Sequence, residues 1–182
     1  MQNHSIRSVV ATGVGAALFI IIGIFINIPI FGNTSIQLQY AVLALFSTLF
    51  GPVAGFLIGF IGHALKDAIQ YGSLSWAWIL GSGVVGLVIG LFRRYYDVAK
   101  GRFALRQVIT FNIVQVIAVA LAYVVIAPIG DKIQYNQAWN YLFAQGFISG
   151  VANVITIGVG GTILLAIYAR TRTQAGSLTK ES

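Results

Sequence analysis

Long runs of apolar residues, separated by short polar or glycine-containing segments, make up most of this sequence. A membrane-spanning helix needs about 20 predominantly apolar residues to cross a hydrocarbon layer of about 30 Å. The pattern predicts six such helices, at 8–28, 36–50, 53–70, 76–92, 105–127 and 141–168. We therefore expect an all-α membrane protein, a six-transmembrane-helix bundle formed by a single domain over residues 1–170. Residues 171–182 are expected to be a short, disordered polar tail on the cytoplasmic side.

The second expected helix is the weakest of the six, because residues 36–50 are few for a perpendicular crossing. If it fails to span, the number of crossings falls to five and the topology inverts after it. Gly51 and Pro52 predict a tight turn into the next helix, since proline suits the first position of a helix and disfavours a helical residue before it.

Composition supports the membrane assignment. Hydrophobic residues make up 58% of the chain and charged residues 8%, and the mean hydropathy is +0.87, which leaves too little polar surface for a water-soluble globule. The sequence has no cysteine, so neither a disulfide framework nor a thiolate metal site is expected. The net charge of +7 does not indicate nucleic-acid binding, because the basic residues lie between apolar runs.

The distribution of lysine and arginine predicts the orientation, since cytoplasmic loops carry the excess of these residues. With six helices and a cytoplasmic N-terminus, only Lys66 and Lys132 fall outside. The basic residues expected inside are Arg7, Arg93, Arg94, Lys100, Arg102, Arg106, Arg170, Arg172 and Lys180. We therefore expect a multi-pass protein of the cell (plasma) membrane with both termini in the cytoplasm.

Small residues recur four apart in the first helix, as Ala11 with Gly15 and as Gly13 with Ala17. Such spacing lets another helix approach closely, either a partner subunit or a helix of the same chain. Spacing alone favours packing within the chain. The glycines at 55, 59 and 62 and at 83, 86 and 90 are likewise interpreted as close packing of a compact bundle.

Polar residues expected near the outer face fall into groups that can converge on a pocket. His63, Lys66 and Asp67 lie three and four apart, so they are neighbours on one helix surface. Gln145, Ser149 and Asn153 form one stripe of the last helix. Aromatic and amide side chains in such an arrangement suit a small, flat, polar ligand, because amides bind heterocycle edges and aromatic rings stack on their faces.

Each group also has a structural interpretation. Tryptophan and tyrosine near a boundary often form an interfacial belt. The cluster at His63, Lys66 and Asp67 can be a local ion-pair network, and the stripe in the last helix can be hydrogen bonding between helices. A metal site is not favoured, since the cluster offers only two ligand types and no cysteine.

Catalytic and transport motifs are sparse. The sequence contains no serine elbow, HExxH pair, carboxylate dyad or Walker motif. His63 with Asp67 is the one candidate acid–base pair, so an intramembrane enzyme is an alternative with little support. A stand-alone channel or secondary transporter is the other alternative, but paired broken helices and an inward acidic residue for ion coupling are not evident. We expect no enzymatic activity.

Four stretches carry a family resemblance: VVATGVGAA, ALFSTLFGPVAGFLIGFIGHALKD, FNIVQ and AQGFISGVANVI. They resemble the substrate-binding S components of energy-coupling factor (ECF) vitamin transporters, in particular a subfamily often described as hydroxymethylpyrimidine transporter components. The resemblance implies a six-helix bundle that captures a water-soluble vitamin or precursor outside the cell. It also implies assembly with a membrane T component and two ABC-type ATPase subunits, which would use ATP, so that no cofactor is expected on this chain.

The resemblance also implies roles for single residues. The small-residue motif that contacts the T component matches Ala11 and Gly15. The expected pocket is roofed by the segment after the first helix and lined by the outer halves of the later helices. The candidate substrate-binding residues are Asn27, Gln37, Tyr40, Trp78, Gln115, Asn140, Gln145 and Asn153, with His63, Lys66 and Asp67 as a polar cluster of pocket or scaffold. Hydroxymethylpyrimidine and a pyridoxine-like ring both fit this set, which contains no charged residue that selects between them.

Overall fold

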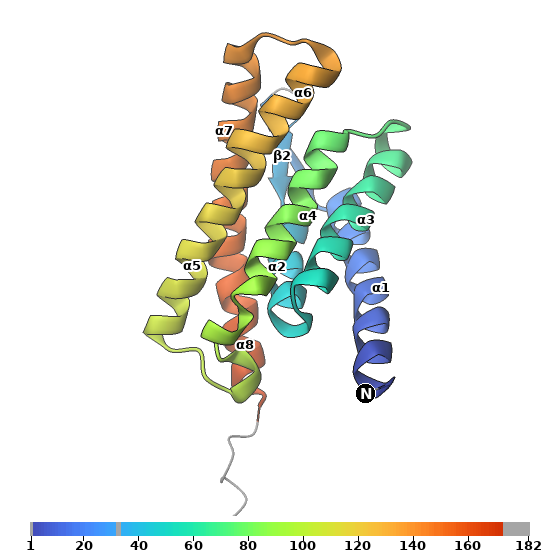
Figure 1. Ribbon diagram of the computed structural model, residues 1–182. Helices are drawn as coiled ribbons and strands as arrows, with labels where there is room; N and C mark the ends of the chain where they lie inside the picture. Colours follow the sequence, from blue (N-terminus) through green and yellow to red (C-terminus); the bar gives the residue numbers. More distant parts are fainter. Residues whose placement is uncertain (1, 32–33, 173–182) are drawn as a thin grey trace, which may run out of the picture.

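The computed structural model describes residues 2–31 and 34–172 of the chain. Most of these residues belong to helices that run alongside one another, with a small two-stranded hairpin near one end (Figure 1). In chain order the main elements are α1 (Gln2–Phe25), β1 (Asn27–Phe31), β2 (Thr34–Gln37), α2 (Gln39–Phe50), α3 (Pro52–Tyr71), α4 (Trp76–Leu91), α5 (Leu105–Ala120), η3 (Leu121–Ile126), α6 (Ala127–Tyr135), α7 (Trp139–Ile155), η4 (Thr156–Gly161) and α8 (Thr162–Arg170). Two short 3-10 helices, η1 (Arg93–Tyr95) and η2 (Val98–Lys100), connect α4 to α5.

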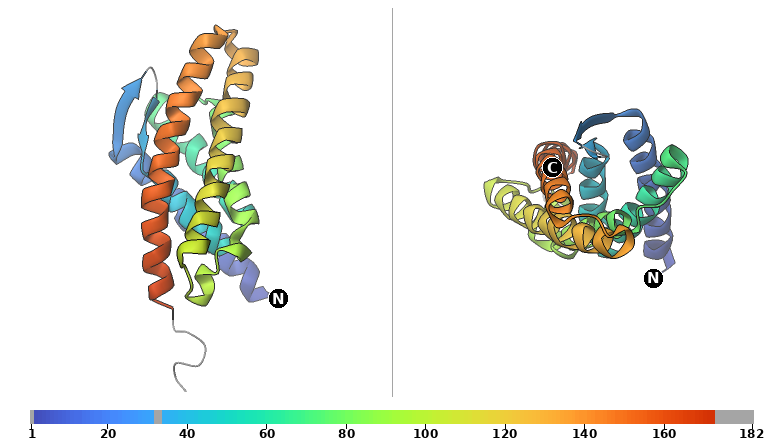
Figure 2. Two further views of the ribbon diagram at one scale, coloured as in Figure 1. Left: turned by 90° about the vertical axis from the view of Figure 1, so that its left-hand side faces the viewer. Right: turned by 90° about the horizontal axis from the view of Figure 1, so that it is seen from above.

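The hairpin adds two short strands to the expected helical fold. The first helix was expected to reach residue 28, but α1 ends at Phe25, and β1 pairs antiparallel with β2 through Asn27 opposite Gln37. Pro29 favours extended backbone at the residue before it, which explains why the chain leaves the helix here. The hairpin stands beside the upper half of α7 in the side view (Figure 2).

The turn between α2 and α3 forms as predicted. Gly51 has a φ of +97°, a value that side chains disfavour, and Pro52 occupies the first turn of α3. This turn fixes the end of α2, which has only 12 residues and therefore spans about 18 Å. Because its residues include the fully buried Leu43 and Ala44, α2 is a central element of the bundle.

Helices α3 and α4 pack backbone against backbone. A Cβ atom added to Gly86 would lie 2.1 Å from the carbonyl oxygen of Gly55, and one added to Gly59 would lie 2.3 Å from that of Ser82. This contact confirms the interpretation of the glycines as packing residues, since only a missing side chain permits such an approach.

Two long helical rods complete the bundle, and both extend beyond the expected ranges. The first runs over Leu105–Tyr135 and the second over Trp139–Arg170, each with a π-helical segment in its middle, η3 or η4. The expected end at residue 127 lies directly before Pro128, which cannot donate a backbone hydrogen bond. The preceding π segment has already shifted the hydrogen-bonding pattern there, which allows the helix to continue through the proline.

Four helical segments of the described chain are long and apolar enough to cross a membrane: Ile6–Phe25, Pro52–Tyr71, Leu105–Tyr135 and Trp139–Arg170. A fifth is reached if Trp76–Leu91 and Arg93–Lys100, bent by 45°, count as one span. The protein is thus a membrane protein with a mainly helical fold. Six spans stay a prediction, because α2 is too short by this measure, and most of the expected polar tail lies outside the described residues.

The two ends of the bundle differ in character. The beginning of α1, the connection from α4 to α5 and the end of α8 gather at one end, and the hairpin and the α6–α7 connection lie at the other (Figure 1). At the first end Arg172 donates to the carbonyl of Ala99 at 3.4 Å. Lys100 donates a hydrogen bond to Asp97 at 2.7 Å, and this hydrogen bond lowers the pKa of the carboxyl, so Asp97 stays ionised at neutral pH.

Candidate functional site

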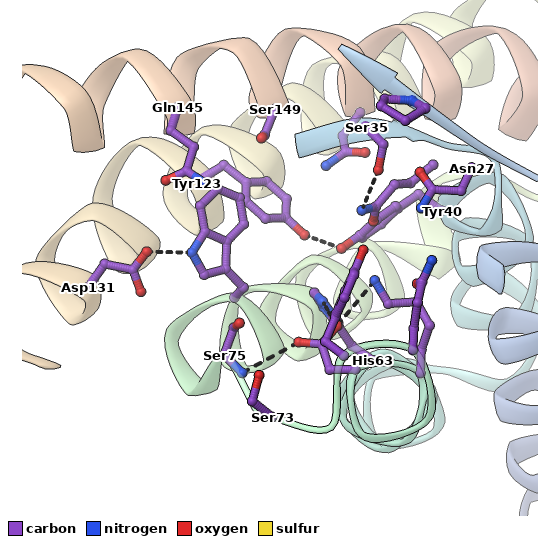
Figure 3. Close-up of a pocket in the computed structure, with 18 of the residues that line it drawn as sticks. Asn27, Ser35, Tyr40, His63, Ser73, Ser75, Tyr123, Asp131, Gln145 and Ser149 are labelled. Atoms are coloured by element: carbon purple, nitrogen blue, oxygen red, sulfur yellow. Dashed lines mark hydrogen bonds and ion pairs between the residues drawn. The ribbon is translucent and has the colours of Figure 1, made fainter. Parts of the chain in front are cut away.

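A cavity of about 640 Å³ opens at the hairpin end of the bundle (Figure 3). Its walls come from the hairpin, α2, α3, α4, η3, α6 and α7, so segments from most of the chain meet there. Polar and aromatic side chains dominate the lining, which consists of Asn27, Pro29, Ser35, Gln37, Tyr40, His63, Lys66, Asp67, Gln70, Tyr71, Ser73, Ser75, Trp78, Tyr123, Asp131, Tyr135, Gln137, Tyr141, Gln145, Ser149 and Asn153.

The shortness of α2 explains where the cavity lies. The helix begins only at Gln39, and Tyr40 in its first turn lines the cavity. Longer neighbouring helices continue past this point, so the space in line with α2 is not filled by a helix. The hairpin residues Asn27 and Gln37 border this space instead.

Three residues of α3 form a buried charged group in the cavity wall. Asp67 Oδ1 lies 3.2 Å from the Lys66 ammonium and 3.3 Å from His63 Nε2. Lys66 and Asp67 are each 2% exposed, and the ammonium also lies 5.4 Å from the centre of the Tyr71 ring. Charges buried this deeply are retained only when they are paired, and here they pair with each other.

Hydrogen bonds extend this group across three further elements. His63 Nδ1 lies 2.5 Å from Ser82 Oγ of α4, and that oxygen lies 2.6 Å from the Tyr40 hydroxyl of α2 and 3.2 Å from the Tyr123 hydroxyl of η3. The two tyrosine hydroxyls also bond to each other. A polar network with satisfied members holds its side chains in single positions, so this wall of the cavity is preorganised.

Aromatic rings border the same space. The rings of Trp78 and Tyr123 lie 5.5 Å apart at 38°, and Tyr40 packs edge-on against Tyr123 and Phe19. Trp78 donates its indole N–H to Asp131 Oδ2 at 2.6 Å. Trp78, which is half-buried, gives a flat ligand an apolar face to stack on, while the buried Tyr40 and Tyr123 hold its surroundings in place.

The polar stripe of α7 lies in the opposite wall. Gln145, Ser149 and Asn153 are all buried and all line the cavity, as expected from their spacing of four residues. Ser149 Oγ and Asn153 Oδ1 have no hydrogen-bond partner among the described residues. Buried polar groups rarely stay unpaired, so these two are available to a ligand.

The structure brings most of the candidate residues together. Asn27, Gln37 and Tyr40 from the first part of the chain line the cavity with Trp78, Gln145 and Asn153. The cluster of His63, Lys66 and Asp67 lines it as well, so it belongs to the pocket wall and not to a separate scaffold.

Gln115 and Asn140 do not line this cavity. Gln115 is buried between helices, where its amide donates to the carbonyl of Val154 at 3.3 Å. Asn140 is exposed at the start of α7. It precedes Gln145 by five residues, which at 3.6 residues per turn places it on another side of the helix from the polar stripe.

Asp131 is the lining residue that sequence reasoning missed most clearly. It lies in α6, beyond the expected end of the fifth helix, so it was assigned to a loop. A signal was present, because Asp131 is one of only four acidic residues in the chain and the continuing helix carries it to the cavity end. Tyr123 of η3 lines the cavity as well, although it is not among the candidate residues.

The small pair Ala11 and Gly15 faces into the bundle. Ala11 is 7% exposed, and a Cβ atom added to Gly15 would lie 2.6 Å from Ile58 of α3. The pair thus packs within the chain, and its expected contact with a partner stays a prediction. Gly13 and Ala17, the other pair, are exposed, and an added Cβ at Gly13 would have no neighbour within 4 Å.

These features define a class of protein: a helical membrane protein that encloses a polar, aromatic-lined binding cavity near one end of its bundle. The comparisons with known proteins agree. The family model described as "ECF-type riboflavin transporter, S component" matches residues 3–170. The chain belongs to this family of ECF S components, which are vitamin transporter subunits that bind substrate and are not enzymes.

Relatives of similar length cover the whole chain. A UPF0397 protein of Streptococcus thermophilus strain CNRZ 1066 is 68% identical over 181 residues, covering 100% of both chains. A UPF0397 protein of Streptococcus gordonii is 58% identical, covering 98% of this chain and 96% of its own. UPF0397 protein YdcD of Lactococcus lactis is 56% identical, with 100% of both chains covered. The narrower hydroxymethylpyrimidine subfamily is not identified by these matches and stays a prediction.

Proposed function

We propose that this chain captures a water-soluble vitamin or vitamin precursor outside the cell and delivers it inside as the S component of an ECF-type importer. The observation that carries the proposal is the cavity at the hairpin end, where aromatic rings and unpaired amide and hydroxyl groups surround one space. Such a lining suits a flat heterocycle with hydrogen-bonding edges.

The charge distribution supports the proposed orientation. Arg93 and Arg94 of η1, Lys100 of η2 and Arg170 of α8 belong to the end opposite the cavity (Figure 1). Excess positive charge is retained on the cytoplasmic side, so the cavity would face outward and both termini would lie inside.

For the ligand, a hydroxymethylpyrimidine or a pyridoxine-like ring is the first candidate. The half-buried Trp78 offers surface for one ring, and amide groups on the hairpin and α7 offer partners for its substituents. Riboflavin, which the family description names, is the second candidate, because a cavity of about 640 Å³ is roomy enough for a larger ring system.

Transport would require partners, since the sequence has no nucleotide-binding motif of its own. We propose a membrane T component and two ABC-type ATPase subunits, as in the family. The exposed face of α1 around Gly13 and Ala17 is the candidate docking surface on this chain, in place of Ala11 and Gly15.

Native mass spectrometry of the detergent-purified chain tests the proposal directly. The chain should retain a small heterocyclic compound when purified alone, and it should join a four-chain complex when co-expressed with a T component and two ATPase subunits. A ligand-free chain that never enters such a complex would contradict the proposal and favour a channel, a secondary transporter or an enzyme that uses His63 and Asp67.

A further inference from the structure

Asp131 stands out among the buried polar groups of the cavity. Asp131 is only 5% exposed, and its Oδ2 atom accepts a hydrogen bond from the indole N–H of Trp78. Oδ1 has no hydrogen-bond partner in the described part of the chain. A buried carboxylate that is only half satisfied is costly, unless a ligand completes its interactions.

No cation of the described residues pairs with Asp131. The neighbouring Lys132 donates to the carbonyl of Gln137 at 3.0 Å, and its ammonium lies 5.7 Å from the centre of the Trp139 ring. Lys66, the one basic side chain besides His63 in the lining, pairs with Asp67. Among the acidic side chains of the lining, Asp131 is therefore the one that has no basic partner in the described part of the chain.

The hydrogen bond between Trp78 and Asp131 also favours a cation beside the Trp78 ring. An indole that donates its N–H to a carboxylate gains electron density in its ring, and cations bind the face of tryptophan more strongly than that of other side chains. The Trp78 ring borders the cavity beside Tyr123. Figure 3 shows Asp131 and Tyr123 on the same side of the cavity, and its dashed line at Asp131 marks the hydrogen bond that this carboxylate accepts from the Trp78 indole.

We propose that the ligand carries a positively charged nitrogen, either a protonated amine or amidine or a cationic ring nitrogen, which the Asp131 carboxylate holds next to the Trp78 ring. This inference rests on the proposed function and narrows its substrate class. It favours amino-substituted or cationic heterocycles over a neutral ring system such as that of riboflavin.

Binding of paired probes to the purified full-length chain tests this inference. Pyridoxamine and pyridoxine differ in one ammonium group, and thiamine and riboflavin supply a cationic and a neutral vitamin. Tryptophan fluorescence should report tighter binding of the cationic member in a pair, by about tenfold or more, because the cation gains an ion pair with Asp131, strengthened by a hydrogen bond in the case of the pyridoxamine ammonium. In Asp131→Asn this preference should disappear, since asparagine keeps the shape and removes the charge.

Two control variants make the test specific. Asp131→Glu keeps the charge and should keep the cation preference, which separates lost charge from misfolding. Asp97→Asn removes a carboxylate that pairs with Lys100 at the other end of the bundle, and this variant should bind every probe as the wild type does. Melting temperatures of all variants are compared before binding is measured.

The outcomes separate this inference from the proposed function. A neutral vitamin that wild type and Asp131→Asn bind equally tightly would overturn the inference and leave the capture function standing. Failure of every cationic probe to bind the wild type would also overturn it. A chain that binds no vitamin and joins no transporter complex would contradict both this inference and the proposed function.

Discussion

At the scale of single residues, two buried tyrosines differ in what their hydroxyl groups do. Tyr40 and Tyr96 are 1% and 0% exposed. The Tyr40 hydroxyl bonds to Ser82 and Tyr123 in the cavity wall, whereas the Tyr96 hydroxyl has no hydrogen-bond partner among the described residues. Burying an unpaired hydroxyl costs free energy, so the same chemical change should have opposite consequences at the two sites.

We expect Tyr40→Phe to lower stability by about 1–3 kcal/mol, because it removes one member of the network that Ser82 and Tyr123 share. The ligand should also bind more weakly, since the side chains of the cavity wall would no longer be held in single positions. Tyr96→Phe is the matched control and should be neutral or stabilising. Thermal unfolding in detergent, with and without ligand, measures both effects, and equal destabilisation by the two changes would contradict the argument.

At Gly146 the backbone of α7 closely approaches that of η3. An added Cβ atom would lie 2.1 Å from the carbonyl oxygen of Tyr123, a distance that requires the backbone to shift. One turn further, a Cβ at Gly150 would meet the Tyr123 side chain at an ordinary 3.8 Å. The glycine therefore sets the position of a cavity residue from a neighbouring helix.

Gly146→Ala should accordingly destabilise the protein by about 1–3 kcal/mol, as overpacking does, and should weaken ligand binding through displacement of Tyr123. Gly150→Ala should change either property little. Melting temperature and ligand affinity of the two variants are the measurements. Wild-type behaviour of Gly146→Ala would show that the helices can separate without consequence for the site.

At the scale of elements, α1 presents two faces of small residues with different roles. The face with Ala11 and Gly15 packs against the chain's own α3, and the face with Gly13 and Ala17 is exposed along with Val10 and Val14. Small side chains on an exposed membrane helix permit close approach by another helix, which makes this face the better candidate for the T component.

The substitution Gly13→Leu tests this surface. It should leave folding and ligand binding unchanged, because nothing lies within 4 Å of the added Cβ, and it should reduce recovery of the four-chain complex severalfold. Gly15→Leu is the contrasting variant and should lower the melting temperature, since its side chain would meet Ile58 and Phe46. Normal complex formation by Gly13→Leu would contradict the proposal that this face of α1 is the docking surface.

At the scale of the whole molecule, the bundle has a basic end and a cavity end. Exposed Ser73 lies at the cavity end between α3 and α4, and exposed Arg172 follows α8 at the basic end. The chain has no native cysteine, so single introduced cysteines report accessibility without background.

The proposed orientation predicts that Ser73→Cys reacts with a membrane-impermeant maleimide in intact cells. Arg172→Cys should react only after the cells are permeabilised, because the positively charged end is retained inside. If only Arg172→Cys were labelled from outside, the topology would be the inverse of the one proposed, with the cavity facing the cytoplasm.

Much of this molecule follows from the sequence because it depends on local chemistry. The apolar runs indicate a membrane protein, since backbone groups in lipid must be satisfied within helices. The turn at Gly51 and Pro52 and the glycines that join α3 to α4 are predictable from residue types alone. The spacing of Gln145, Ser149 and Asn153 determines that they share one face.

The tertiary structure alone shows which of these helix faces pack against one another. Ala11 and Gly15 differ from Gly13 and Ala17 by their neighbours and not by their spacing, so the sequence does not tell packing from docking. Asp131 reaches the cavity because a π segment carries the helix through Pro128, and Gln115 is excluded because it packs between helices. Convergence of distant segments depends on the summed packing of the bundle, which local patterns do not encode.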